Sequence, residues 1–390
     1  MLSSSDVTVI DIGSQSISAY SAERLSDDNF AVKSSCEIDY SGYMDGAWLK
    51  EEEVLPSIHK LLDRIELGSG RIKKLYVGIK KLYVGIPSDF CVVRTVYKKL
   101  VFPKARRVTN ADVDSLFAEN DPFVSSDYAR IHSGAAYYLN DRGERLDSPV
   151  GTLTSYLKAQ LSYIGADREV LSLLRKGLMR RGIRSIRFLQ SEYTAAMHLF
   201  GKEDRDGGII LADIGYLATS VLYVGGDSLL EMKTFSLGGS MIPMGLSNSL
   251  DMPFPAATAL AEKINLGYKE EGDYTLKYDT ASYTFPVEQV NGIAKECIRC
   301  VVNYVQKAIA SFRFETSPYA TIYLTGGGFS RLRSAQEYVA KCFGRNVETV
   351  QPAVPNFCKP NYSTTVGLLK SAFAIEKKER FGFFKKLFRF

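Results

Sequence analysis

The sequence lacks several features that define common classes of protein. No apolar stretch approaches the roughly 20 residues of a membrane-spanning helix, and the first residues lack the basic segment and apolar core of a signal peptide. Six cysteines and only three histidines are scattered along the chain without the spacing of a zinc site. These absences argue against a secreted, disulfide-rich or zinc-binding protein and favour a reduced cytoplasmic compartment.

A strong charge bias is also missing. The chain has 49 Lys and Arg against 44 Asp and Glu, a net charge of +5. Local basic clusters at residues 104–107 and 175–187 fit solvated surfaces better than a nucleic-acid site, so we expect no nucleic-acid partner. The length of 390 residues exceeds one ordinary hydrophobic core and predicts two lobes.

The first motif lies near the N-terminus. An apolar, β-branched run ends on Asp11 and Gly13, and small polar residues follow, which predicts a strand, a tight turn and a second strand. Gly13 would let the backbone approach a ligand closely. Asp11 suits Mg²⁺, which prefers oxygen ligands and keeps several waters. The donors that the turn would offer to a phosphate are Ser14, Gln15 and Ser16.

Two further turns repeat this design. Residues 209–224 form an apolar strand that runs into Asp213 and Gly215, followed by a second apolar run. A triglycine at residues 326–328 follows the strand-like run 320–324 and precedes a helical pattern. Each turn alone is a weak signal, but the three in this order predict a site for a nucleotide phosphate tail.

The order of these turns resembles the superfamily of actin, Hsp70 and the sugar kinases. The resemblance assigns phosphate loops to residues 11–16 and 213–219 and an adenosine loop to residues 326–328. Residues 192–196 and 364–369 resemble the two connecting helices of that superfamily. It implies a two-lobed actin-like (ribonuclease-H-like) α/β ATPase fold that holds ATP and Mg²⁺ between its lobes.

An inserted unit at residues 101–180 narrows the resemblance. It has the pattern of an α+β subdomain and carries a distinctive stretch from Asp147 to Thr152. Both features are similar to the 1C-type subdomain of the FtsA family, the bacterial cell-division homologues of actin, and pilus-assembly relatives share it. The expected elements are a helix capped by Thr109, strands at 128–139 and 153–164, and a helix at 167–181.

This resemblance implies an order of subdomains. The expected divisions are 1–100 (first lobe, 1A), 101–180 (1C-type insertion), 181–205 (first lobe), 206–239 (second lobe, 2A), 240–289 (2B-type), 290–354 (second lobe), 355–372 (first lobe) and 373–390 (linker and membrane-targeting helix).

The resemblance also implies roles for single residues. Asp11 and Asp213 would organise Mg²⁺, and with Glu192, which would position water, they are the catalytic candidates. Glu262 would reach the ribose or the base. The residues expected to hold the nucleotide are Gly13, Ser14, Gln15, Ser16, Gly215, Tyr216, Thr219, Glu262, Gly326, Gly327 and Gly328.

The second phosphate loop departs from the family pattern DIGGGTTD. Tyr216 and Leu217 replace two glycines, and Ser220 replaces an acidic residue. Asn265 stands where the family has a lysine, which removes a possible phosphate or ribose contact. We therefore expect ATP binding with slow or absent hydrolysis.

A seven-residue segment occurs twice in succession, at residues 73–79 and 80–86. A single sheet needs only one such strand, so we expect the second copy to pair and the first to extend the preceding loop. A duplication without function explains the repeat at least as well as a functional insert.

The C-terminal tail has a composition of its own. After a polar linker at residues 377–380, aromatic and basic residues alternate at helical spacing, which is typical of an amphipathic helix lying in a membrane interface. The alternative is a terminal helix packed on the body. The predicted membrane residues are Phe381, Phe383, Phe384, Lys385, Lys386, Leu387, Phe388 and Arg389.

Taken together, the resemblance implies an ATP-binding cell-division scaffold. It would self-associate into filaments, grip the C-terminal tail of FtsZ through the 2B-type subdomain, and contact other division proteins through the 1C-type subdomain. It would lie in the cytoplasm on the inner face of the cell membrane at the division site. The alternatives are a pilus-assembly adaptor of the same fold and, with less support, a kinase of the superfamily.

Overall fold

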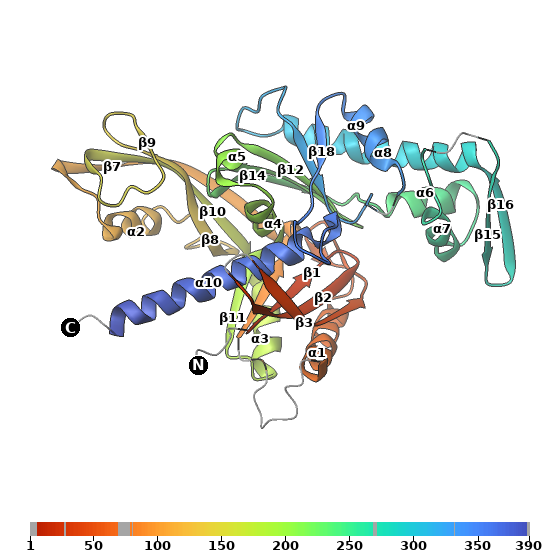
Figure 1. The fold of residues 1–390 in the computed structure, drawn as a ribbon, viewed down its shortest axis with the longest axis horizontal. Coiled ribbons are helices and arrows are strands. Elements are labelled where there is room, and N and C mark those ends of the chain that lie inside the picture. The colour runs from red at the N-terminus through yellow and green to blue at the C-terminus, as the bar shows by residue number, and fades with distance from the viewer. Residues whose placement is uncertain are drawn as a thin grey trace.

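The computed structural model describes residues 6–26, 29–68, 79, 81–267, 271–330 and 332–387, with side chains up to residue 379. Figure 1 shows a mixed α/β molecule in which strands β7 to β10 and the hairpin β15–β16 lie at opposite ends, with the N-terminal sheet below them. No helix in the described ranges is long and apolar enough to cross a membrane.

The first lobe is built on a five-stranded sheet with the order β11-β6-β1-β2-β3. Strand β1 pairs antiparallel with β2 and parallel with β6. One face is covered by α1, whose Val54, Ile58 and Leu62 are fully buried at helical spacing. The bounds are β1 Asp6–Ile12, β2 Ser16–Arg24, β3 Phe30–Asp39, β4 Tyr43–Met44, β5 Ala47–Trp48, α1 Glu51–Gly68, β6 Lys81–Ile86 and β11 Ser185–Gln190.

Strand β6 is the second copy of the repeated segment. It lies in the interior of the sheet, between β1 and β11, and Leu82, Val84 and Ile86 are fully buried. The prediction that the second copy pairs is confirmed. The first copy, apart from Ile79, falls outside the described residues.

The insertion forms a four-stranded antiparallel sheet with the order β7-β10-β8-β9. Helix α2 covers one face and contributes Leu116 to a core with Phe102, Leu157 and Tyr163. Its predicted cap is confirmed, since the Thr109 hydroxyl accepts from the amide of Asp112. The bounds are β7 Cys91–Arg107, α2 Asn110–Ala118, β8 Tyr128–Leu139, β9 Arg145–Leu146, β10 Leu153–Asp167 and α3 Arg168–Arg180.

The second lobe repeats the topology of the first, with the sheet order β14-β13-β12-β17-β18. Again a hairpin, β12–β13, pairs antiparallel and then continues into a parallel neighbour, β17. This repetition explains why the Asp-x-Gly turn occurs twice in the sequence. The bounds are β12 Ile209–Ile214, β13 Thr219–Gly225, β14 Ser228–Phe235, α8 Val287–Ala310, β17 Ile322–Thr325, α9 Ala335–Phe343 and β18 Val347–Thr349.

The remaining elements connect and flank these sheets. Their bounds are α4 Ser191–Leu199, α5 Lys202–Asp206, α6 Met241–Ser249, α7 Phe254–Ala261, β15 Asp273–Tyr278, β16 Ala281–Pro286 and α10 Ser363–Leu387. The subdomain divisions expected from the sequence remain predictions.

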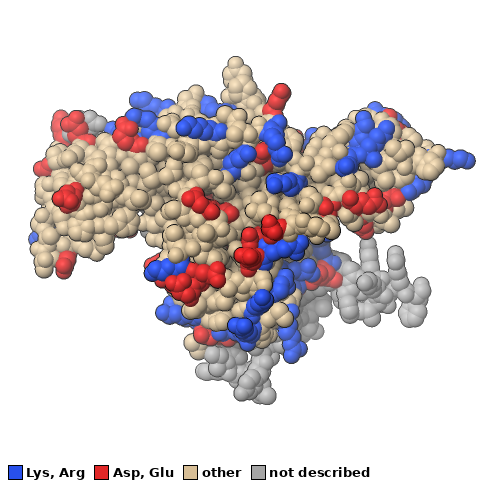
Figure 2. Space-filling model, turned by 180° about the vertical axis from the view of Figure 1, so that it is seen from behind, with Lys and Arg blue, Asp and Glu red and all other residues tan. Residues whose placement is uncertain are grey.

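Basic and acidic side chains are interspersed over the first lobe in the view from behind (Figure 2). Within the basic cluster at residues 175–187, Arg181 pairs with Asp63 at 2.7 Å and with Glu66 at 3.0 Å, both on α1. That cation therefore ties the end of α3 to α1.

Helix α10 differs from the sequence prediction in one respect. Residues 377–380, expected to be a polar linker, are helical and continue to Leu387 without a break. Lys, Glu and Arg are good helix formers, and Glu376 and Glu379 are held by ion pairs to Lys81. The charged composition that suggested a linker is here the solvated part of a long helix.

Gly367 lets α10 approach α4, and this contact is testable. A Cβ at Gly367 would lie 2.5 Å from the backbone nitrogen of Ala195, whereas a Cβ at Gly292 of α8 would meet nothing within 4 Å. We expect Gly367→Ala to lower the free energy of unfolding by ~1–3 kcal/mol through overpacking. The matched Gly292→Ala should raise it by ~0.5–1 kcal/mol. Urea denaturation of both variants tests this, and equal effects would contradict the close packing of α10 on α4.

Candidate functional site

A cavity of about 270 Å³ opens between the two lobes, close to the lower limit for small-molecule sites. Its walls come from the β1–β2 turn, the β12–β13 turn, the turn after β17, helix α7 and the start of α10. The predicted site residues that line it are Asp11, Gly13, Ser14, Gln15, Ser16, Glu192, Asp213, Gly215, Tyr216, Glu262, Gly326, Gly327 and Gly328.

Thr219 is the predicted nucleotide residue that does not line the cavity. It is fully buried in β13, and its hydroxyl donates to the carbonyl of Leu237 at 2.6 Å. The side chain of Thr219 points toward the segment that carries Leu237 and away from the cavity. The prediction that Thr219 contacts the nucleotide is therefore corrected.

Glycines bring the turns of the second lobe into backbone contact. The amide of Gly239 donates to Gly215 O at 2.9 Å, and the amide of Gly328 donates to Ile214 O at 2.7 Å. A Cβ on Gly326, which has φ +93°, would lie 2.4 Å from Asp213 Oδ1. At Gly327, by contrast, the nearest protein atom to an added Cβ is 3.4 Å away. Only Gly327 of the triglycine therefore has room for a side chain.

Asp11 sits at the end of β1 and is nearly fully buried. Its Oδ2 accepts hydrogen bonds from the hydroxyls of Thr364 at 2.7 Å and Thr365 at 2.8 Å, in the first turn of α10. Burial raises the pKa of Asp11 above its usual value, against the lowering effect of the two hydroxyls. The N-terminal strand and the C-terminal helix thus meet on one carboxylate.

Glu192 and Asp213 complete a group of three carboxyls. Burial raises the pKa of Glu192 to about 7. Removal from bulk solvent, and then the charges of Glu192 and Asp11, raise the pKa of Asp213 well above its usual value. Glu192 Oε1 also accepts from the amide of Ser88 and from the hydroxyl of Ser220, each at 3.3 Å. A bound cation would reduce the repulsion among the carboxylates of Asp11, Glu192 and Asp213.

The cavity is strongly acidic. Glu37 and Glu262 line it in addition to the three carboxyls, and no Lys, Arg or His among the described residues does so. No three His, Cys, Asp or Glu side chains in the described ranges converge closely enough to hold a metal directly. The donor set fits Mg²⁺ held largely through water, and such an ion would be needed before polyphosphate could enter.

The two phosphate loops touch each other. The amide of Leu217 donates to Ser14 Oγ at 3.0 Å, so one backbone donor of the second loop is already used. The Tyr40 hydroxyl donates to Gly13 O at 2.8 Å and fixes the first loop from behind. Among the described hydrogen bonds none uses the amides of Ser14 and Gln15, which leaves these donors for a phosphate.

Sequence reasoning misses the hydroxyls that hold Asp11. The resemblance places residues 364–369 in a connecting helix, but the hydrogen bonds of Thr364 and Thr365 to Asp11 span 353 and 354 residues, and no local pattern reveals them. Glu37 is missed as well. It lies on β3, and its carboxylate accepts a hydrogen bond from the Ser16 hydroxyl on the neighbouring strand β2.

The predicted membrane residues fall at the limit of the described chain. The backbone of Phe381 to Leu387 is helical, but their side chains lie outside the described residues, as do Phe388 and Arg389 entirely. The membrane assignment therefore stays a prediction.

Solved structures identify the fold. The PilM–PilN type IV pilus biogenesis complex contains a chain with a TM-score of 0.62 at 14% identity, covering 94% of this chain and 98% of that one. MreB 5 of Spiroplasma citri bound to AMPPNP gives 0.56 at 10% identity, with 97% and 98% covered. The MamK double helical filament gives 0.53 at 14% identity, with 94% and 98% covered. The chain has the two-lobed fold of the actin-like ATPases.

The curated sequences that are similar to this chain include several FtsA proteins. The chain resembles the cell division protein FtsA of Neisseria meningitidis serogroup B, with 22% identity over 95% of this chain and 91% of that protein. FtsA of Pseudomonas aeruginosa is 22% identical over 92% and 87%, and FtsA of Bacillus subtilis is 20% identical over 93% and 82%. No family profile matches the sequence. The resemblance to FtsA inferred from the motifs is thereby confirmed.

The raised pKa of Glu192 predicts a pH dependence of stability. Between the ordinary value of 4.5 and about 7, the folded chain keeps a proton that the unfolded chain releases. The stability that this proton contributes is fully present below about pH 4.5 and is lost as the pH rises through about 7. Across this window, the unfolding free energy of the parent should fall more than that of Glu192→Gln. We expect the difference between the two declines to be ~3 kcal/mol at most.

Urea denaturation at pH 5, 6, 7 and 8 measures both slopes. The slope that remains in the variant is expected to come from Asp11 and Asp213, whose pKa values are raised for the same physical reason. Parallel curves for the parent and the variant would show that Glu192 is not held protonated by its surroundings.

Proposed function

We propose that this chain is an actin-like, ATP-binding protein of cell division. The observation that carries the nucleotide part is the cavity, where glycine turns from both lobes converge around Asp11 and Asp213. The nucleotide-bound MreB 5 structure supports this assignment through the shared fold. The FtsA relatives support the division role.

Mg²⁺ would neutralise the phosphate charge within the acidic cavity. Asp11 and Asp213 would accept hydrogen bonds from its bound waters, while the amides of Ser14 and Gln15 donate to phosphate oxygens. Glu262 and Tyr216 would contact the ribose and the base, since both residues line the same cavity.

We infer that hydrolysis is slow and that ATP acts mainly as a structural ligand. Glu192, the candidate for positioning water, is already engaged by Ser88 and Ser220. The amide of Leu217 is engaged by Ser14. These groups must reorganise before they can stabilise a transition state, and electrostatic catalysis depends on groups that are organised in advance.

The partners follow from the resemblance to FtsA. The chain would self-associate, as the MamK filament supports for this fold. Its 2B-type subdomain, residues 240–289, would bind the C-terminal tail of FtsZ, and its insertion at residues 101–180 would bind other division proteins. The tail would hold the assembly on the inner face of the cell membrane at the division site.

A pilus-assembly adaptor is the second candidate. The structural similarity to the PilM–PilN complex favours it, but such an adaptor has no need of the basic, aromatic tail. A kinase of the superfamily has less support, because the sequence offers no convincing catalytic base in a separate substrate cleft. Vesicle binding by the tail therefore separates the first proposal from the second.

Two substitutions test the nucleotide site. Asp11→Ala removes a carboxylate that would hold the waters of Mg²⁺, and Gly327→Val places a side chain in the one part of the triglycine with room for it. We expect each to raise the dissociation constant of Mg·ATP by at least ~10-fold. Isothermal titration calorimetry measures the constants.

Asp6→Ala is the matched control, because Asp6 lies at the far end of β1 and pairs with Lys33 at 3.0 Å. It should leave the affinity unchanged. If both site variants bind Mg·ATP as tightly as the parent, the nucleotide does not occupy this cavity.

Two further substitutions test the tail. Phe384→Glu together with Leu387→Glu puts carboxylates on the apolar face of the predicted interfacial helix, where burial in lipid is costly. We expect this double variant to lose binding to anionic vesicles in a flotation assay and to bind Mg·ATP like the parent. Tyr319→Glu alters a side chain that is 91% exposed on the body and serves as the control. Unchanged vesicle binding by the double variant would mean that the membrane contact lies elsewhere.

A further inference from the structure

Strand β7 forms an open edge of the insertion. It pairs with β10 in one continuous register, from Cys91 opposite Ala166 to Val101 opposite Tyr156, and no described strand pairs with its other side. In an antiparallel pair the backbone N–H and C=O groups of each strand alternate between its two sides. Half of these groups in residues 91–101 therefore point away from the sheet.

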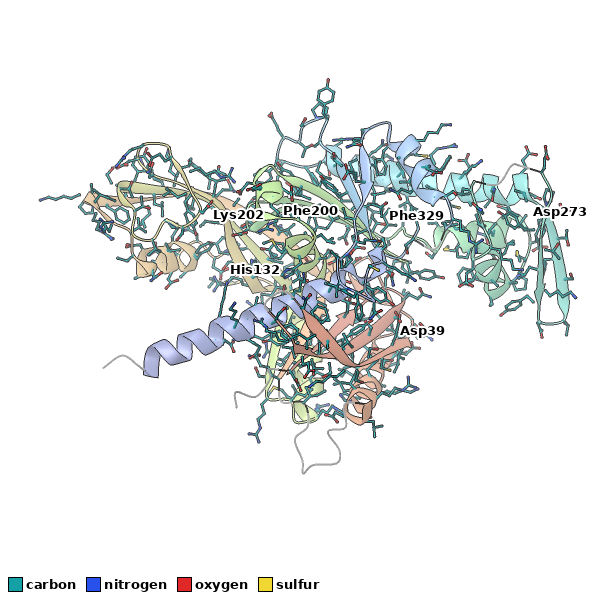
Figure 3. All side chains as sticks on the ribbon, in the orientation of Figure 1. Asp39, His132, Phe200, Lys202, Asp273 and Phe329 are labelled. Atoms are coloured by element: carbon teal, nitrogen blue, oxygen red, sulfur yellow. The ribbon has the colours of Figure 1, made fainter. Side chains whose placement is uncertain are left out.

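The second lobe covers only the base of this edge. Strand β14 lies against the first residues of β7, where residues 91–94 and 231–234 line a cavity of about 180 Å³. Figure 3 labels His132 at the base of the insertion, where its Nε2 lies 3.2 Å from the hydroxyl of Tyr193 on α4. Figure 1 shows β7 extending from the base to the far end of the molecule. Residues 95–101 therefore form the part of the edge that a partner can reach.

This open part presents apolar and basic side chains to solvent. Tyr97 is 50% exposed and Val101 is 64% exposed, and Lys98 and Lys99 are exposed between them. Because alternate residues of a strand point the same way, Tyr97, Lys99 and Val101 share one face. Leu100, which points the other way, packs against the core beneath α2.

Two lysines lie opposite each other on this face. Lys99 of β7 and Lys158 of β10 are directly opposed in the register of the two strands. Their Nζ atoms lie 4.0 and 5.5 Å from the ring centroid of Tyr156, and on its other side Lys158 faces Leu139 of β8. Neither lysine pairs with a carboxylate in the described ranges. Like charges opposed across two strands destabilise a sheet, so this lysine pair has a cost in the free chain.

Other cations of the insertion have anionic partners. Arg106 donates two hydrogen bonds to Asp112, at 2.6 and 2.7 Å, and Arg130 pairs with Asp121 at 3.2 Å. Figure 2 shows acidic side chains along the lower part of the insertion, with basic ones above them and at its tip. The insertion thus neutralises these arginines internally but leaves the lysine pair without an anion.

Protection of the edge does not explain the lysine pair. Lysines on an edge strand commonly prevent indiscriminate pairing with other chains, and Lys98 and Lys104 of β7 fit that role. Lys158, however, lies on β10, an interior strand between β7 and β8, where no edge needs protection. An anion bound beside Lys99 would remove the repulsion between Lys99 and Lys158.

We propose that the open edge of β7 binds an extended acidic segment of a partner protein, which adds to the sheet as a further strand. Backbone hydrogen bonds to residues 95–101 hold the segment. A carboxylate opposite Lys99 draws that side chain away from Tyr156 and leaves the ring to Lys158. Apolar side chains two residues to either side of the carboxylate pack on Tyr97 and Val101.

The inference rests on the proposed role of the insertion in binding other proteins, and it adds the chemistry of the partner. A peptide is favoured over an anionic membrane, because lipid head groups would meet the lysines but would not pair with the backbone of the strand. The test uses a synthetic peptide and no division protein. It can therefore fail while the chain still acts in division, and it can succeed if the division role is wrong.

The probe is the fluorescein-labelled peptide Thr-Val-Thr-Glu-Glu-Tyr-Thr, and its binding to the complete chain is measured by fluorescence anisotropy. We expect it to bind at least ~5-fold more tightly than the same peptide with lysines in place of the two glutamates. Lys99→Glu keeps the strands paired, since it puts opposite charges across them, but it should weaken binding of the acidic peptide ~5-fold or more. It should also tighten binding of the lysine peptide. Lys60→Glu makes the same change of charge at an exposed position of α1 and should leave both affinities unchanged.

Methylation of the peptide backbone separates strand addition from simple attraction between charges. One peptide carries N-methyl groups on its odd-numbered amides, and a second carries them on its even-numbered amides. Only one of these sets faces β7 in an added strand, so one methylated peptide should lose binding and the other should keep it. Hydrogen exchange at residues 95–101 should slow when the unmodified peptide binds.

Equal affinities of the two methylated peptides, or unchanged hydrogen exchange at residues 95–101, would show that no strand is added. Equal binding of the acidic and lysine peptides, or binding of neither, would overturn the site. A third contrary result would come from a chain without residues 380–390. If this chain binds phosphatidylglycerol vesicles, loses them with Lys99→Glu and does not release them to the acidic peptide, the lysines serve a lipid surface instead.

Discussion

A carboxylate that is removed from water needs hydrogen-bond donors to replace the water that it loses. The donors that bind Asp11 come from a distant part of this chain. The residue ends the first strand, and its partners are two hydroxyls at the start of the last helix. Asp213 lies close enough for the two charges to repel each other. The ends of β1, β12 and α10 are thereby drawn to one place, and the cavity forms around it. The same group that organises the fold is the one that would face Mg²⁺.

The glycines of the second lobe serve this arrangement by allowing backbone segments to touch. Gly215, Gly239 and Gly328 come from three separate segments, and their hydrogen bonds and close contacts leave no room for side chains. The first lobe closes against them through Ser14 and Leu217. Such contact gives a well-defined site, but it occupies donors that a triphosphate would use. We therefore expect the site to favour nucleotide binding over rapid hydrolysis.

Much of the fold could be predicted from the sequence, because its signals are local. The apolar runs before Asp11 and Asp213, the cap at Thr109 and the spacing of α1 each reflect contacts within a few residues. The contacts of Thr364 and Thr365 with Asp11 depend on tertiary structure and leave no local pattern. The linker at residues 377–380 was predicted wrongly for a related reason: Glu379 pairs with Lys81 and Arg187, which are distant in the sequence. Thr219 was misplaced because the turn pattern does not say which side chain faces the cavity.

We propose that this chain links a polymer of FtsZ to a membrane. Flotation with anionic vesicles, Mg·ATP and polymerised FtsZ tests it most directly, with the chain and with a variant that lacks residues 380–390. We expect FtsZ to rise with the vesicles when the chain carries residues 380–390 and Mg·ATP is present. Removing those residues should abolish its recovery, and omitting ATP should weaken it. FtsZ that stays at the bottom of the gradient while the chain itself floats would show that the chain does not link FtsZ to the membrane.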